Sequence, residues 1–367
     1  MVRHIFVGID LGDKNSVARM ALDREKTERY TFVNNRCGRR RLFEEARRRA
    51  AQAGGAEIRM AYEASACGFV LADETQAEQI HCEVLAPTKM EKSVEQRKQK
   101  NDDRDADDVV EKLRAHVLAG NRLPTVWVPD RQTRDDRELV RARMELGDKQ
   151  TKLKSQIQML LKRYGLEKPS GLGAGWTIAY QGWLEVVTRT ESGILGCSGR
   201  RALSSLLRQL NFVESEIQRV QQEVEQLARQ ERHQPFVDEL TQEPGVGVMT
   251  AMVYRTEIGY AGRFRRGRQV GKFTGLTPTS HESGEQNDRK GHISHQGPPR
   301  LRKMLCQASW VRICHDKGDR RIYDEVVRRN PKKKKIAIVA IMRRLSVRLW
   351  HRMRKIELQM TGAIEKN

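Results

Sequence analysis

The sequence predicts three parts: an α/β N-terminal domain (residues 1–130), a long helical coiled-coil middle (131–235) and a mainly α-helical C-terminal domain (236–367). Three observations support this division. Short β-branched runs alternate with helical patterns near the N-terminus, an apolar heptad seam runs through the middle, and the last third is basic, helical and rich in turns.

The N-terminal domain opens with short apolar runs at hairpin spacing. A basic helix then ends at a pair of glycines, and helices and strands alternate after it. The expected strands are 5–11, 16–23, 29–34, 57–63 and 82–87, and the expected helices are 39–53, 68–77 and 106–118. Three hairpin strands followed by alternating helices and strands is the order of the ribonuclease-H-like fold.

Long helices are expected between residues 134 and 232. In the second, apolar residues repeat at alternating spacings of three and four, as in a coiled coil: Leu203, Leu206, Leu210, Val213, Ile217, Val220, Val224 and Leu227. The Gly-rich segment between the helices, SGLGAGWTIAYQGW, is interpreted as a loop or hinge. The seam can pair inside one chain or between two chains. Its narrow stripe and charged flanks favour the second alternative, and hence a homodimer or a dimer of dimers.

The positive charge is concentrated near the C-terminus. The formal net charge is +21, and residues 255–356 hold 27 Lys and Arg against 8 Asp and Glu, a local net charge of +19. This asymmetry indicates a polyanion partner. Nucleic acid is favoured over a membrane, since membrane binding would require an amphipathic anchor or a lipidation signal.

Composition also excludes some classes of protein. No apolar stretch approaches the roughly 18 residues of a membrane span, and the N-terminal sequence lacks a secretory signal layout, so we expect a cytoplasmic protein. The six scattered cysteines contain no CxxC pair and are expected to be reduced core thiols.

Four carboxylates stand where a metal-dependent nuclease would need them. Asp10 and Glu63 each end a predicted strand, so both are expected at one edge of the sheet. NDDRDADD opens a predicted helix, on which Asp102 and Asp105 share a face because they are three residues apart. Hard oxygen ligands suit Mg²⁺, and two ions about 4 Å apart can clamp the attacking and leaving oxygens of a phosphodiester. We therefore expect Mg²⁺ at these four acids, as one or two ions, with Mn²⁺ able to substitute. The alternative for Asp102 and Asp105 is simple capping of the helix.

The C-terminal third holds candidate nucleic-acid contacts. EPGVGVMTA is typical of a helix-hairpin-helix turn, in which backbone N–H groups near Gly245 and Gly247 would bind phosphate; an ordinary turn between helices is the alternative. Ser283 lies in a polar loop and could attack a phosphodiester if a base or a metal activated it, although a Ser-Gly pair more often only forms a turn. The basic residues expected to contact phosphate are Arg289, Lys290, Arg300, Arg302, Lys303, Lys332, Lys333, Lys334 and Lys335.

Together these motifs resemble the DEDD transposase family of insertion sequences, the recombinases guided by a bridge RNA. GIDLG, YEAS and NDDRDA match the family's acids in order, with a RuvC-like N-terminal domain. PGVG, GLTPTSHESG and GHISHQGPPRLR match its C-terminal signatures. The resemblance implies an Mg²⁺-dependent recombinase that binds donor DNA, target DNA and a guide RNA. In this interpretation Asp10, Glu63, Asp102 and Asp105 form the acidic site and Ser283 is the nucleophile. Asp103 adjoins Asp102 and is the alternative for the third acid.

The sequence is also compatible with other functions. One alternative is a metal-dependent, junction-resolving nuclease in which the four acids activate water and Ser283 has no catalytic role. The other is a nucleic-acid-binding protein without catalytic activity. GIDLG also opens actin-like ATPases and sugar kinases, but the second phosphate loop of those folds is not found.

Overall fold

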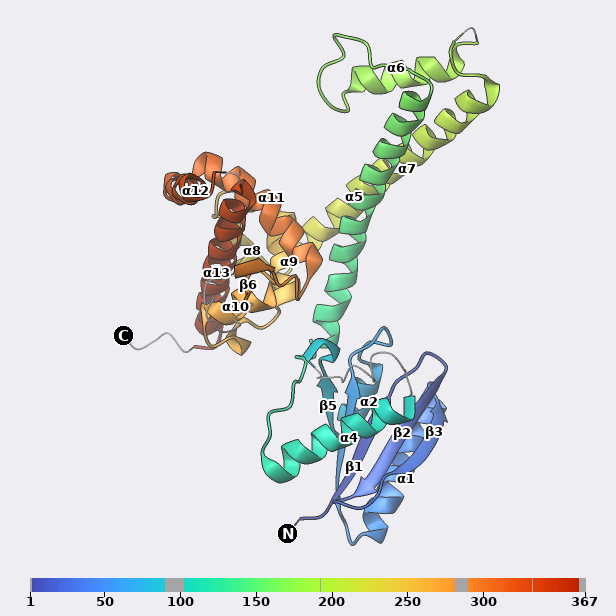
Figure 1. Cartoon of the computed structure of the whole chain (residues 1–367), viewed down its shortest axis with the longest axis vertical. Coiled ribbons are helices and arrows are strands. Elements are labelled where there is room, and N and C mark those ends of the chain that lie inside the picture. Colours follow the sequence, from blue (N-terminus) through green and yellow to red (C-terminus); the bar gives the residue numbers. More distant parts are fainter. Residues whose placement is uncertain (1, 90–101, 192, 281–289, 332, 363–367) are drawn as a thin grey trace. The chain divides into compact units, whose positions relative to one another are not determined.

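A computed structural model describes residues 2–89, 102–191, 193–280, 290–331 and 333–362. The chain divides into two compact units, Met1–Pro129 and Asp130–Asn367 (Figure 1). The helical middle and the C-terminal helices, which we expected as separate domains, lie together in the second unit.

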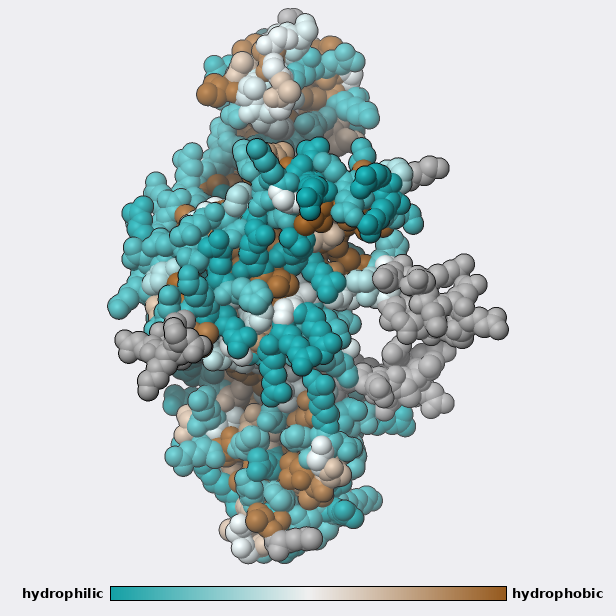
Figure 2. Space-filling model, turned by 90° about the vertical axis from the view of Figure 1, so that its left-hand side faces the viewer, coloured by the Kyte–Doolittle hydropathy of each residue, from teal (hydrophilic) through white to brown (hydrophobic). Residues whose placement is uncertain are grey.

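In the part of the chain that the structure describes, no helix is long and apolar enough to cross a membrane. Hydrophilic residues cover most of the face shown in Figure 2, with small scattered hydrophobic patches between them. The six cysteines are all unpaired, as expected, but Cys37, Cys197 and Cys314 are exposed and are therefore not core thiols.

The first unit is built on a mixed five-stranded sheet in the order β3-β2-β1-β4-β5. β1 pairs antiparallel with β2, β2 pairs antiparallel with β3, and the pairs β1–β4 and β4–β5 are parallel. This arrangement confirms the predicted ribonuclease-H-like fold class. The strands are β1 (His4–Asp10), β2 (Asn15–Leu22), β3 (Glu28–Val33), β4 (Glu57–Glu63) and β5 (His81–Leu85).

Helices cover both faces of this sheet. The residues of β1 alternate between the faces, as the period of two in a strand requires. Ile5, Val7 and Ile9 pack with apolar residues of α1 (Arg36–Gln52) and α2 (Val70–Ala77). Phe6, on the opposite face, packs with apolar residues of α4 (Asp102–Ala119). A short 3-10 turn, η1 (Pro87–Lys89), follows β5.

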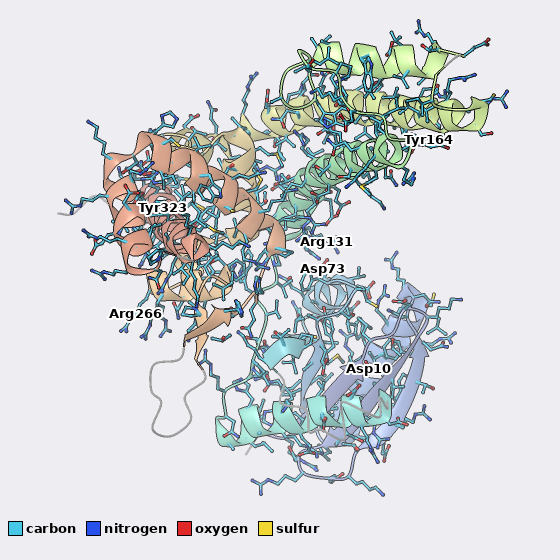
Figure 3. All side chains as sticks on the ribbon, turned by 45° about the horizontal axis from the view of Figure 1, so that its top comes forward. Asp10, Asp73, Arg131, Tyr164, Arg266 and Tyr323 are labelled. Carbon is cyan, nitrogen blue, oxygen red and sulfur yellow. The ribbon has the colours of Figure 1, made fainter. Side chains whose placement is uncertain are left out.

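The second unit begins with a long helical hairpin. α5 (Arg131–Arg163) packs against α7 (Cys197–Ala228), and α6 (Ile178–Arg189) lies near the far end, where Figure 3 labels Tyr164. We expected the whole Gly-rich segment to be a loop, and this was wrong for α6. Its apolar residues Tyr180 and Leu184 are buried against the hairpin, which gives the helix a packed face that glycine content does not reveal.

The heptad seam of α7 pairs within the chain. Leu203, Leu210 and Val213 form one core with Leu153, Ile157 and Leu160 of α5, and Val224 and Leu227 continue into the C-terminal core. The structure thus favours the intramolecular alternative over the coiled coil between chains that we had preferred, because α5 already covers the apolar stripe.

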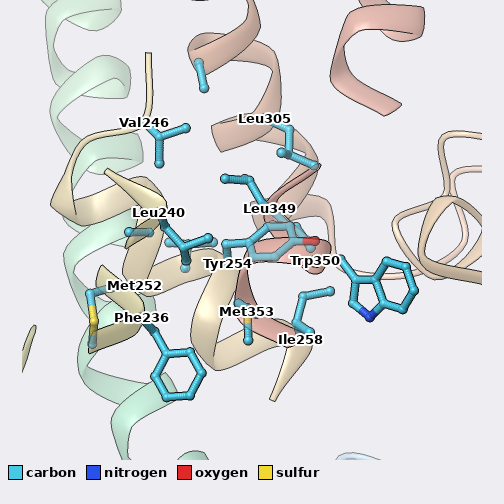
Figure 4. Packing of buried hydrophobic residues seen from close by; sticks show 14 of the residues in the cluster. Phe236, Leu240, Val246, Met252, Tyr254, Ile258, Leu305, Leu349, Trp350 and Met353 are labelled. Carbon is cyan, nitrogen blue, oxygen red and sulfur yellow. The ribbon is translucent and has the colours of Figure 1, made fainter. Parts of the chain in front are cut away.

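The remaining helices form the C-terminal core. Tyr254 lies at its centre among Leu240, Leu305 and Leu349 (Figure 4), and its hydroxyl donates to the Ser346 carbonyl at 2.5 Å. Val140 and Met144 of α5 join the same core, which ties the hairpin to this part of the unit. The elements are α8 (Gln234–Leu240), α9 (Val248–Ile258), η2 (Ala261–Arg263), α10 (Gly267–Phe273), β6 (Pro278–Ser280), β7 (Lys290–Ile293), α11 (Pro299–His315), α12 (Lys317–Arg329) and α13 (Lys334–Met360).

Candidate active site and nucleic-acid interface

Asp10 and Glu63 end neighbouring parallel strands on the same face of the sheet. Ile9 of β1 is in register with Tyr62 of β4, so the next residues, Asp10 and Glu63, stand side by side at the carboxyl edge. Asp10 follows Phe6 by four residues and Glu63 follows Ala61 by two, and both Phe6 and Ala61 pack on α4. The period of two therefore directs both carboxylates to the α4 side. Both residues are partly buried, and Figure 3 labels Asp10 at the end of its strand.

The start of α4 lies beside these two strand ends. A Cβ on Gly8 would come within 2.4 Å of the Ala106 carbonyl oxygen, so only glycine permits this close approach of helix and strand. Phe6 packs further along the helix, with Val109 and Leu113. The helix thus runs opposite to β1, and its first turns, which carry Asp102 and Asp105, fall next to Asp10.

The acids of α4 divide between two faces. Asp105 adjoins the buried Ala106 and is itself partly buried. Asp103 and Asp107 face the β2–β3 hairpin, where they pair with Arg29 and Arg19. Burial by itself raises the pKa of the Asp107 carboxyl, but hydrogen bonds from Arg19 and Thr27 more than offset this, and the pKa lies below its ordinary value.

Carboxylates from β1, β4 and α4 suit a hard divalent cation, since Mg²⁺ prefers oxygen ligands. Among the side chains that the structure describes, however, no three His, Cys, Asp or Glu residues are grouped closely enough to hold a metal ion. The backbone of Asp102 begins α4, but its side chain is outside that described set. The sheet edge therefore brings Asp10, Glu63 and the start of α4 together without a complete ligand set among those side chains.

The predicted phosphate contacts on α11 are engaged within the protein. Nη2 of Arg300 lies 2.5 Å from Oε1 of Glu145, and Lys303 pairs with Asp148, so both contact the long helix α5. Nη1 of Arg302 donates to the Gly297 carbonyl at 2.9 Å and lies 3.4 Å from the Thr274 and Gln296 carbonyls. Arg302 thus holds the two ends of the predicted nucleophile loop together.

Left-handed glycines close the base of this same loop. Gly275 has φ +69° and Gly297 has φ +91°, and a Cβ on Gly297 would come within 1.8 Å of the Phe273 carbonyl oxygen. β6 and β7 pair antiparallel above this base. Ser283 and Arg289 fall between the two strands, outside the described residues, as does the side chain of Lys290.

The remaining predicted phosphate contacts are two glycines before α9 and the lysines at the start of α13. Gly245 has φ +85°, and a Cβ there would come within 2.3 Å of the Ala308 carbonyl on α11, so this glycine serves packing between helices. Gly247 is exposed at the N-terminus of α9, with open space around it. Lys333, Lys334 and Lys335 are exposed at the start of α13, whereas Lys332 is not among the residues described.

A buried ionic network centred on Arg312 was not predicted from the sequence. This side chain is fully buried on α11, donates to Glu243 and Asp316 at 2.7 Å each, and pairs with Asp319. Nε of Arg352, from α13, lies 2.5 Å from Glu243. Burial raises the pKa of Glu243, but Arg312 and Arg352 lower it by more, so the carboxyl remains ionised. The Glu of EPGVG therefore acts as a structural anchor, and no spacing in the sequence indicated its partners.

Two models of known protein families match this chain. A transposase model of the DEDD type matches residues 7–166, which include α4 and all of the sheet except the first three residues of β1. The model described as "Transposase IS116/IS110/IS902 family" matches residues 237–324, which include Gly245 and the β6–β7 hairpin. The chain belongs to this family of insertion-sequence transposases, with a DEDD domain at its N-terminus.

Individual relatives agree with the family models. The chain is 27% identical over 325 residues to "Putative transposase y4qE" of Sinorhizobium fredii. The aligned region covers 88% of this chain and 75% of that protein. It is also 27% identical over 221 residues to the transposase for insertion sequence element IS1111A of Coxiella burnetii, covering 60% of this chain and 56% of the relative. The transposase for IS1328 of Yersinia enterocolitica is 27% identical over 174 residues, 47% of this chain and 48% of that one.

Proposed function

We propose that this transposase cuts and rejoins DNA through a covalent phosphoserine, with the metal-binding acids Asp10, Glu63, Asp102 and Asp105 and the nucleophile Ser283. The observation that carries the proposal is the register of α4 on β1, with Gly8 against Ala106. This register supports a common position for acids from three elements that are distant in the sequence. The pairing of β6 with β7 and the hydrogen bond from Arg302 to the Gly297 carbonyl hold together the two ends of the segment that contains Ser283.

In the proposed reaction the Ser283 hydroxyl oxygen forms a bond to phosphorus and loses its proton. The bond from phosphorus to the 3′ oxygen breaks, and that oxygen gains a proton and leaves as a 3′-hydroxyl. The serine then carries the 5′-phosphate of the cut strand. Attack by a 3′-hydroxyl of the exchanged strand reverses these steps, so no ATP is required. Mg²⁺ at the acids would supply positive charge against the charge developing on the phosphate.

The proposed partners are donor DNA, target DNA and a guide RNA. The net charge of +19 over residues 255–356 and the exposed Lys333, Lys334 and Lys335 support contact with phosphates. Guidance by RNA rests on the family resemblance, and we expect a discrete RNA to copurify with the protein. Sequencing of the nucleic acid bound to the purified chain tests this, and DNA alone in the preparation would argue against a guide RNA.

A nicked DNA substrate tests the phosphoserine. With Mg²⁺, the unaltered protein should become attached to DNA by a bond that survives SDS and boiling, and peptide mapping should place the label on Ser283. Ser283→Ala should abolish both adduct and cleavage, since alanine has no oxygen with which to attack. Asp10→Asn should do the same while keeping the fold, because a neutral amide cannot balance the charge of Mg²⁺.

Matched controls and the rival functions complete this experiment. Ser280→Ala and Ser294→Ala flank the nucleophile and should still form the adduct. Cleavage without an adduct would indicate a nuclease that uses water, and label on Ser294 would assign the nucleophile to that residue. Full cleavage by Asp10→Asn would contradict the metal site, and unchanged biological activity without Asp10 would indicate a binding protein without catalysis.

A further inference from the structure

Two acids of α4 that are not among the four proposed ligands hold the helix to the β2–β3 hairpin. Nε of Arg19, on β2, donates to Oδ1 of Asp107 at 2.8 Å, and the Thr27 hydroxyl donates to the same oxygen at 2.6 Å. Nε of Arg29, on β3, lies 2.9 Å from Oδ1 of Asp103. We call these five residues the α4 latch.

The main contact of the latch is partly shielded from solvent. The side chains of Arg19 and Asp107 are 20% and 33% exposed, so their charges interact more strongly than those of a pair in open water. The second contact, between Arg29 and Asp103, is more exposed, at 55% and 37%, and contributes less.

Helical geometry separates the latch from the proposed ligands. Asp103 and Asp107 are four residues apart and share one face. Ala106, whose carbonyl lies against Gly8, separates the two faces, and Asp105 lies on the side of Ala106 opposite to Asp107. The helix therefore has two anchors, the Gly8 contact on β1 and the latch on β2 and β3. Two anchors on different strands fix its rotation about its own axis, which a single contact would leave variable.

We propose that Asp103 and Asp107 are positioning residues, which fix the rotation of α4 and so direct the face bearing Asp102 and Asp105 toward Asp10 and Glu63. The proposal rests on the proposed function of those four acids as metal ligands. It also assigns the third acid to Asp102, since Asp103 is engaged with Arg29. A small rotation of the helix would move the ligand oxygens, and partners that orient ligands typically affect metal affinity.

The test measures metal affinity in the full-length chain, both as Mn²⁺ binding by electron paramagnetic resonance without DNA and as the Mg²⁺ concentration for half-maximal nicking. Asp107→Asn should raise the dissociation constant for Mn²⁺ and the half-maximal Mg²⁺ concentration by roughly 10-fold or more. Saturating Mg²⁺ should restore most of the nicking rate. Arg19→Gln should weaken metal binding in the same direction. Combining the two changes should add little, because each already breaks the same contact.

The two single variants separate positioning from a simple field effect. Asp107→Asn removes a negative charge near the site, whereas Arg19→Gln removes a positive one. Through the electrostatic field alone, the first would weaken Mn²⁺ binding and the second would strengthen it. Shifts of opposite sign, or no shift, would therefore overturn the latch. Loss of nicking by Asp107→Asn at every Mg²⁺ concentration would also overturn it, because Asp107 would then be a metal ligand.

Control variants distinguish loss of the latch from unfolding and from a general change of charge. Glu111→Gln makes the same charge change on the same helix, where the 64% exposed carboxylate pairs with Arg114, and should leave metal affinity unchanged. If Asp107→Asn unfolds at a lower temperature than the unaltered protein, Thr27→Ala serves in its place. It removes one hydrogen bond and no charge, and it should weaken metal affinity by a smaller factor. Full Mg²⁺-dependent nicking by Asp10→Asn would contradict the proposed function itself. An inactive Asp10→Asn with unshifted latch variants would contradict the latch alone.

Discussion

At the scale of single residues, the fully buried Arg312 shows how charge contributes to the packing of the C-terminal helices. Arg312 contacts Glu243, Asp316 and Asp319 from inside the C-terminal core. A buried ion pair is costly to assemble, but removing one partner leaves the other charge without compensation. The side chain thus links the turn before α9, α11 and the start of α12.

Arg312→Met should therefore lower the free energy of unfolding by about 3–5 kcal/mol, because Glu243 and Asp319 lose their buried partner. Chemical denaturation followed by circular dichroism measures the change. Arg320→Met is the matched control, since Arg320 pairs with Asp324 while 55% exposed. Its loss should leave the free energy of unfolding nearly unchanged, because exposed ion pairs contribute little to stability. Equal stabilities for the two variants would contradict a structural role for the network.

The acids at the sheet edge could be predicted from the sequence, whereas the buried ion pairs could not. Asp10 and Glu63 each end a strand, and strand ends in a parallel pair meet at one edge, so the periodicity of two segments was enough to bring them together. Glu243 and Arg312 are 69 positions apart on elements whose packing has no local signature. The same limit applies to Arg300 and Lys303, which we predicted as phosphate contacts and which contact Glu145 and Asp148 of α5.

At the scale of elements, the α5–α7 hairpin shows what a heptad pattern can specify. The pattern correctly indicated that α7 needs an apolar partner along its length. It could not indicate which chain supplies that partner, because an intramolecular and an intermolecular helix bury the same stripe. α5 carries its own apolar residues at Leu153, Ile157 and Leu160, and these cover the seam.

Leu210→Lys with Ile217→Lys should consequently unfold the hairpin instead of dissociating an oligomer. Leu210 is 1% exposed, and charges in this seam should lower stability by at least about 3 kcal/mol. Thermal unfolding with light scattering in parallel measures both effects. Gln209→Lys with Gln218→Lys adds the same charge at exposed positions of α7 and should leave the melting temperature nearly unchanged. A reduced mass with unchanged melting would instead place the seam between chains.

At the scale of the whole molecule, the proposed acids and the proposed nucleophile belong to different compact units, divided after Pro129. The order of the elements and their periodicity predicted the fold class of the first unit and the mainly helical character of the second, although α6 was missed. Their mutual placement does not follow from either pattern, since both units have complete cores of their own.

Mixing two inactive proteins tests whether one reaction uses units from two chains. Asp10→Asn keeps Ser283, and Ser283→Ala keeps the acids, so a mixed assembly contains one complete set. We expect the mixture to regain DNA adduct formation, with all the adduct on the Asp10→Asn chain, distinguished by a size tag. Each protein alone should give none. An inactive mixture, under conditions where exchange of chains is verified, would show that both parts act within one chain.

The packing of α4 over the sheet also bears on how the protein is made. Translation delivers Asp10 with β1 and Glu63 with β4, while Asp105 and the helix that covers Phe6 and Ala61 come later. A fragment that ends before residue 102, through interrupted synthesis or proteolysis, would carry two of the four acids and leave this apolar face of the sheet uncovered. Exposed apolar surface of this kind favours capture by chaperones and proteases. The capacity to cut DNA would then arise only in chains whose N-terminal unit is complete.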